Sequence, residues 1–133
     1  MKQLRGRAGF TLIELLIVII IIGILAAIAI PMFLSQRERA KDAAVKGAVH
    51  NIELGIASYG IDHGDQYPAA VADKTVLVDV AGIPYVDNWP ANPWTGADMA
   101  SGAGLGDYTY TLTGGGTSFI LAGHMSSGDF VVP

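Results

Sequence analysis

A long apolar run near the beginning of the chain restricts its possible folds more than any other feature. Between residues 10 and 34 the only formally charged side chain is Glu14. An α-helix rises about 1.5 Å per residue, so these residues extend about 37 Å, enough to cross a hydrocarbon layer of about 30 Å with some tilt. The run therefore predicts a membrane-spanning helix.

The charges on either side of the run are unequal. Lys2, Arg5 and Arg7 precede it, and the positive-inside rule then predicts a cytoplasmic N-terminus with the rest of the chain outside. Residues 10–133 hold 5 basic against 12 acidic side chains. Nucleic-acid binding needs basic side chains to displace counterions from phosphates, so no nucleic-acid partner is expected.

The chain contains no cysteine, so disulfides and thiolate chemistry cannot contribute to its stability or function. The part outside the membrane must be held by packing, with or without a metal.

A second helical segment is expected at residues 35–61. Its apolar side chains recur at spacings of four, three, four and three, which is typical of a helix with one buried face: Val45, Val49, Ile52, Ile56 and Tyr59. Gly60, Gly64 and Pro68 mark its end. No cluster of helix-breaking residues separates the two segments, so one continuous helix of about fifty residues, roughly 75 Å long, is predicted.

The remaining residues, 62–133, are expected to form loops and a small antiparallel sheet. Three segments have the alternation or composition of strands: 107–113, 117–123 and 129–132. A further strand is expected at residues 75–80. The predicted fold class is α+β, a long N-terminal helix packed on a three- to four-stranded antiparallel sheet.

Residues 9–14 read GFTLIE, and LLIVIIIIGILAAIAIP follows at residues 15–31. With the short basic segment before it, this run resembles the N-terminal signature of type IV pilins and type II secretion pseudopilins. The resemblance implies that residues 1–9 are a leader that is removed, that a prepilin peptidase cuts between Gly9 and Phe10, and that the new Phe10 amine is N-methylated.

Glu14 also requires a physical explanation. A carboxylate within a membrane helix costs about 2.5–3.5 kcal/mol at the centre and less near an end. Cleavage before Phe10 would create an amine that can pair with Glu14 of a neighbouring subunit and set the register between helices. The resemblance gives Glu14 this same role in assembly.

Gly23 and Pro31 interrupt the apolar helix. Proline removes one backbone hydrogen bond and clashes with the carbonyl four residues earlier, which loosens the helix near Ala27. The resemblance implies that this stretch melts when the subunit leaves the bilayer, and a simple kink is the alternative.

An ordinary secretory signal peptide or signal anchor is the alternative for the whole segment, with a cleavage site at residues 26–29. That alternative leaves the junction between Gly9 and Phe10 and the presence of Glu14 unexplained.

The part of the chain that follows the apolar run, residues 35–133, is called the head below. It contains candidates for a metal site. Residues 88–96, NWPANPWTG, resemble the loop before the last strands of pseudopilin heads, and some pseudopilins bind calcium there. Oxygen-bearing side chains occur in and around this loop: Asp87, Asn88, Asn92, Asp98 and Asp107. They are expected to be solvated turn residues and no cofactor is expected, with a calcium site as the alternative. His50, His63 and His124 lack the spacing of zinc ligands. No catalytic motif is present, and the protein is not expected to be an enzyme.

The function expected from the sequence is a structural subunit of a type IV pilus, a homopolymer built through residues 10–34. The alternative is the major pseudopilin of a type II secretion system, and a membrane-anchored extracytoplasmic binding module is the alternative of a different class. The resemblance implies minor pilin-like subunits, an assembly ATPase and a membrane platform protein as partners. Membrane lipid surrounds the single-pass precursor in the cytoplasmic membrane, before assembly into an extracellular pilus or a periplasm-spanning pseudopilus.

Overall fold

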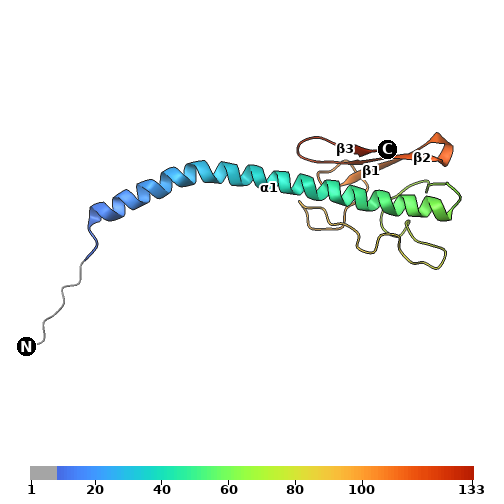
Figure 1. The fold of residues 1–133 in the computed structure, drawn as a ribbon, viewed down its shortest axis with the longest axis horizontal. Helices are drawn as coiled ribbons and strands as arrows, with labels where there is room; N and C mark the ends of the chain where they lie inside the picture. The colour runs from blue at the N-terminus through green and yellow to red at the C-terminus, as the bar shows by residue number, and fades with distance from the viewer. Residues whose placement is uncertain (1–8) are drawn as a thin grey trace, which may run out of the picture. The chain divides into compact units, whose positions relative to one another are not determined.

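The computed structural model describes residues 9–133, so the predicted basic leader residues Lys2, Arg5 and Arg7 lie outside the described part. The chain divides into two compact units, Met1–Arg37 and Glu38–Pro133. Its elements, in order, are helix α1 (Leu12–Asp62), strand β1 (Tyr108–Thr113), a single 3-10 turn η1 (Gly114–Gly116), strand β2 (Ser118–Gly123) and strand β3 (Phe130–Val132) (Figure 1).

Helix α1 has 51 residues and continues through Pro31, as the prediction of one continuous helix requires. It ends where the sequence predicts. Gly64 adopts a positive φ of 66°, and the Asp65 amide donates to the Gly60 carbonyl at 2.9 Å. The bond from Asp65 to Gly60 is the longer of the two hydrogen bonds of a Schellman motif, in which a glycine in the left-handed region ends a helix.

The second half of α1 supplies one side of the hydrophobic core of the head. The side chains of Val45, Val49, Ile52 and Ile56 are fully buried, and Tyr59 packs against them half-buried. The predicted apolar stripe is therefore confirmed. The other side of the core comes from the sheet and the loops: Val71, Leu77, Val86, Met99, Tyr108, Phe119, Leu121, Met125 and Val132.

The sheet has three antiparallel strands in the order β1-β2-β3, which confirms the predicted antiparallel sheet (Figure 1). Tyr108 pairs with Gly123 at one end of β1 and Thr113 with Ser118 at the other. Gly123 lies so close to α1 that a side chain there would collide with Val45 and Val49. The absence of a side chain on Gly123 thus allows the sheet to pack directly on the helix.

The prediction of a strand at residues 75–80 is wrong, because the structure has no strand there. Two aspartates form local turns there instead. The carboxylate of Asp73 accepts the amide of Thr75 at 2.8 Å, and that of Asp79 accepts the amides of Ala81 and Ile83, both at 2.8 Å. Aspartate side chains that bond nearby amides compete with sheet pairing. Only an isolated bridge between Val78 and Pro84 remains.

One buried carboxylate joins the helix to the turn after β2. Asp42 is 7% exposed, and one of its oxygens accepts the Ser126 amide at 2.9 Å and the Ser126 hydroxyl at 3.0 Å. Burial opposes ionisation of Asp42, but hydrogen bonds from Ser127 and Ser126 outweigh it and lower the pKa below its usual 3.8. The charged form of Asp42 therefore stabilises the folded head.

We expect Asp42→Ala to lower the free energy of unfolding by about 1–2 kcal/mol at neutral pH, because Ser126 loses its acceptor. Since the folded-state pKa lies below the unfolded value, the contribution of Asp42 is present above that value and disappears as the pH falls through the folded-state pKa. Urea denaturation of the full chain in detergent micelles at several pH values measures both effects. Asp87→Ala, which removes an exposed carboxylate, is the control, and an equal loss in that variant would contradict the assignment.

Two helical glycines of α1 form a matched pair for testing the packing. A side chain at Gly55 would overlap Val86, whereas one at Gly47 meets no atom within 4 Å. We expect Gly55→Ala to cost about 1–3 kcal/mol and Gly47→Ala to add about 0.5–1 kcal/mol of stability. Denaturation of the full-length variants, followed by fluorescence, measures the difference. Stabilisation at both positions would show that the Gly55 contact is loose.

Candidate functional site

The first described residues make no contacts that would explain their identity. Gly9 and Phe10 are exposed, and a side chain added at Gly9 would meet no atom within 4 Å. No packing contact within residues 9–133 therefore requires a glycine before Phe10.

Glu14 and Thr11 together cap the start of α1. The amide and hydroxyl of Thr11 donate to the same Glu14 carboxylate oxygen at 2.9 and 2.7 Å, and the Glu14 amide donates to the Thr11 hydroxyl at 3.3 Å. This reciprocal arrangement is a capping box, which satisfies amides that have no partner within a helix. Because it uses only residues 11 and 14, cleavage after Gly9 would leave it intact.

The positive charge that Glu14 needs is not found within residues 9–133, where no ion pair includes Glu14. The surface around it is apolar. All large apolar side chains between Leu12 and Leu34 are exposed. The least exposed is Val18, at 46%, and the most exposed is Leu12, at 88%. Helix α1 is long and apolar enough to cross a membrane, with a mean hydropathy of 3.2 in its most apolar window.

Sequence reasoning identified Glu14 but missed the role of Thr11. The signal was present, since threonine followed three residues later by glutamate before an apolar run is the sequence pattern of a capping box. Gly23 and Pro31 both lie inside α1, and a side chain at Gly23 would meet no atom within 4 Å. Melting of the helix at these positions stays a prediction.

In the head, the side chains considered as calcium ligands make hydrogen bonds or ion pairs with different protein groups. The Asn92 amide nitrogen donates to the Asp107 carboxylate at 3.0 Å, and the same carboxylate accepts the Ala100 amide at 3.2 Å. The Asp98 carboxylate pairs with Lys74 at 2.9 Å. No group of three or more His, Cys, Asp or Glu side chains suited to a metal occurs among the described residues.

The three histidines are also separated. His50 pairs with Glu53 at 2.8 Å, and His63 stacks on Tyr59 with ring centroids 3.8 Å apart. His124 pairs with Asp129 at 2.8 Å, and its second ring nitrogen is buried without a partner among the described atoms. Each histidine has its own local contact, and none shares a site with another.

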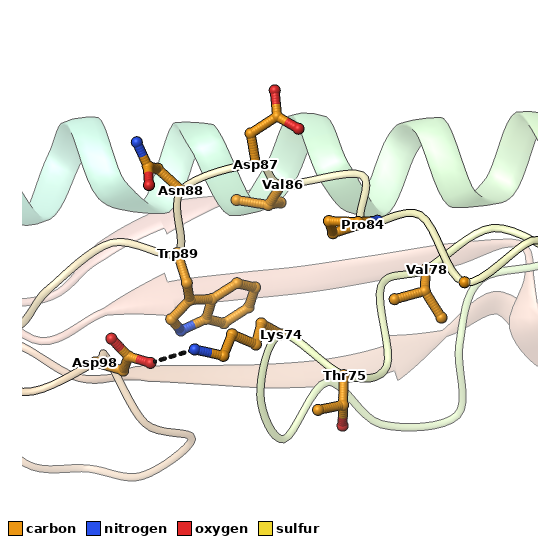
Figure 2. Close-up of a pocket in the computed structure, with 10 residues that line it drawn as sticks. Lys74, Thr75, Val78, Pro84, Val86, Asp87, Asn88, Trp89 and Asp98 are labelled. Atoms are coloured by element: carbon orange, nitrogen blue, oxygen red, sulfur yellow. Dashed lines mark hydrogen bonds and ion pairs between the residues drawn. The ribbon is translucent and has the colours of Figure 1, made fainter.

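A groove of about 460 Å³ opens beside Trp89 (Figure 2). Its walls are Trp89, Val78, Pro84 and Val86, with the Lys74 and Asp98 ion pair at one end. The Trp89 ring nitrogen donates to the Met99 carbonyl at 2.9 Å, which fixes the indole. Figure 2 shows the side chains of Asp87 and Asn88 directed away from the ion pair, so the groove does not gather the aspartates around a common centre.

Comparison with known proteins identifies the type of chain. The family description "prokaryotic N-terminal methylation motif" matches residues 4–30. Type II secretion system core protein G of Pseudomonas aeruginosa is 34% identical over 102 residues, 69% of this chain and 71% of that protein. The chain belongs to the type IV pilin and type II secretion pseudopilin family.

Two other relatives show the breadth of this pilin-like family. Type II secretion system core protein G of Escherichia coli is 28% identical over 104 residues, 71% of each chain. The type IV wide pilus major component PilA4 of Thermus thermophilus is 48% identical over 60 residues, 45% of this chain and 46% of that protein. No solved structure matches the chain. The predicted family resemblance and the predicted pilin-like fold are both confirmed.

Replacement of Thr11 in this pilin-like chain tests the capping box. We expect Thr11→Val to weaken the first turn of α1 by about 1 kcal/mol, which speeds amide hydrogen exchange at residues 12–15 about fivefold. Thr11→Ser keeps the hydroxyl and should exchange at the normal rate. Hydrogen exchange of the full chain in micelles measures the effect, and equal rates in both variants would show that the cap is not formed.

Proposed function

We propose that this protein is a structural subunit of an extracytoplasmic filament and that it polymerises through the apolar half of α1 after removal of residues 1–9. One observation carries the proposal: the surface from Leu12 to Leu34 is apolar and exposed, and its one carboxylate, that of Glu14, has no ion pair with any of residues 9–133. Such a surface requires cover, first from lipid and then from other copies of the same helix.

Removal of residues 1–9 supplies the missing charge. A prepilin peptidase would cut between Gly9 and Phe10, and the amine of Phe10 would carry a positive charge with or without N-methylation. In the filament, this amine lies against Glu14 of a neighbouring subunit. Thr11 holds one Glu14 oxygen at 2.7 Å, and the structure gives no partner to the other oxygen within residues 9–133. The second oxygen is the natural acceptor for the incoming amine.

The remaining partners follow from the proposed assembly. The precursor would lie in the cytoplasmic membrane as a single-pass protein, with residues 1–9 in the cytoplasm. An assembly ATPase and a platform protein would drive its extraction from the bilayer, with minor pilin-like subunits in the same filament. A loosened helix at Gly23 and Pro31 would allow the apolar half to repack during this step.

The comparisons support two kinds of filament for different reasons. The 48% identity with the Thermus pilus component covers 60 residues and supports the type IV pilus expected from the sequence. The similarity to type II secretion core protein G covers 69% of the chain, a length that must include part of the head. That extent supports a pseudopilus, which we propose as the second candidate. Purification of the filament from its own host separates the two by the apparatus that co-purifies.

Replacement of Glu14 tests the central step. We expect Glu14→Gln to be inserted and cleaved normally but to form few or no filaments, because a buried charge that loses its partner costs about 3–5 kcal/mol. Glu53→Gln removes the same charge from the head and is the matched control. Electron microscopy counts the filaments, and mass spectrometry of the mature N-terminus measures processing. Normal filaments from Glu14→Gln, or an uncut N-terminus in the wild type, would contradict the proposal.

A further inference from the structure

The charges that follow the apolar run are separated along the chain. Four of the five basic residues after residue 34 lie within ten positions: Arg37, Arg39, Lys41 and Lys46. Residues 47–133 hold nine acidic side chains and a single basic one, Lys74. Arg37 precedes the unit Glu38–Pro133, whose first nine residues hold three basic side chains against two acidic ones, Glu38 and the buried Asp42. The unit is therefore slightly basic where it begins and acidic over the rest of its length.

Trp94 contacts the first residues of this unit, Glu38 and Lys41. The Trp94 ring nitrogen donates to the Glu38 carboxylate at 3.3 Å, across 56 positions of the sequence. The Lys41 ammonium lies 5.0 Å from the centre of a Trp94 ring, and it pairs with Glu38 at 3.3 Å. With Arg39, these residues form what we call the basic–aromatic cluster: Glu38, Arg39, Lys41 and Trp94.

The loop that carries Trp94 is fixed by a buried amide. Asn92 is 2% exposed, and its carbonyl oxygen accepts the Trp94 amide at 2.8 Å. Its nitrogen donates to the Leu105 carbonyl at 2.8 Å and to Asp107 at 3.0 Å. Every polar atom of the Asn92 side chain is thus used in holding the loop, and Trp94 is presented from a rigid support.

The side chains of the cluster differ in how much of their surface is exposed and in whether their polar groups already have a partner. Lys41 keeps only 18% of its side chain exposed, so its main contribution is to hold the indole. Arg39 is exposed and takes part in no hydrogen bond or ion pair within the described part of the chain. Trp94 is half-buried, so part of its surface is accessible. An arginine and an amphipathic indole therefore remain available to a partner.

We propose that the basic–aromatic cluster is a contact with anionic lipid headgroups, made while the precursor is in the bilayer. Arg39 follows Leu34 by five residues, about 7.5 Å along a helix, which is close to the thickness of one headgroup layer. Tryptophan concentrates at this depth because one part of the ring prefers an apolar surrounding and its N–H a polar one. Basic side chains are attracted to anionic lipids there.

The separation of basic and acidic residues along the chain orients the head relative to the lipid surface. The acidic remainder of the head is repelled by an anionic surface, while the cluster is attracted to it. The head is thus oriented with its basic beginning toward the lipid. This inference rests on the proposed function only in requiring a membrane-inserted precursor, and it does not depend on filament formation.

Tryptophan fluorescence in the full-length chain tests the contact. The chain has two tryptophans, so Trp89→Phe leaves Trp94 as the only reporter and Trp94→Phe leaves Trp89. Each variant is reconstituted into vesicles of phosphatidylethanolamine and phosphatidylglycerol that contain lipids with quenchers at known depths. We expect Trp94 to be quenched most by the quencher nearest the headgroups, and Trp89 to be quenched much less.

A matched pair of charge variants in the Trp89→Phe background tests the role of Arg39. Arg39→Gln and Lys46→Gln each remove one basic charge from the same helix, but Lys46 lies seven residues further from the apolar run and already contacts the Phe130 ring at 5.6 Å. We expect Arg39→Gln to lower the headgroup-bound population about fivefold in phosphatidylglycerol vesicles. Lys46→Gln should leave this population unchanged.

Each result separates this inference from the proposed function. Resistance to alkaline extraction shows insertion independently of the fluorescence. An inserted chain in which Trp94 is quenched no more than Trp89, or in which both charge variants behave alike, would overturn the inference and leave the filament proposal standing. A chain that does not insert would overturn both. Should Trp89→Phe fail to fold, the difference between wild type and Trp94→Phe gives the same measurement.

Discussion

The carboxylate of Glu14 is the polar group on which the behaviour of the apolar half of α1 depends. A charge in this position costs free energy in lipid unless it is partnered. The Thr11 amide and hydroxyl, at 2.9 and 2.7 Å, satisfy one carboxylate oxygen without neutralising the charge. The capped carboxylate is thus tolerated in a single chain, and it still favours any environment that supplies a cation. On the proposed cleavage after Gly9, the new N-terminus of a neighbouring subunit would be such an environment.

The second constraint is that one helix must be covered in two different ways. The stripe from Val45 to Ile56 is closed by the chain's own sheet, with Gly123 allowing close approach. The surface from Leu12 to Leu34 has no such cover from the described residues. Because the head completes its core without the apolar half, that half can exchange lipid for other helices while the head stays folded. A head that folds independently of the apolar half would remain folded if that half moved from lipid to contacts with other helices.

The sequence predicted the elements whose signals are local. Strands β1, β2 and β3 were expected within one residue of their observed limits, since alternation and glycine turns act over a few positions. Residues 75–80 have strand composition, but Asp73 and Asp79 bond nearby amides and bend the chain. The buried role of Asn92 was not foreseen, because its partners lie 13 and 15 positions away. Contacts at such separations leave no periodic signal in one sequence.

Polar groups mark both ends of the apolar run, and this arrangement has a consequence for assembly. On the proposed account, extraction from the bilayer removes Arg39 and Trp94 from the headgroups at one end and moves Glu14 toward a new amine at the other. The first loss occurs before the second gain, because the neighbouring helix is reached only after the subunit has moved. Extraction is therefore uphill at first and needs free energy from outside the chain, whereas the completed ion pair opposes return to the membrane.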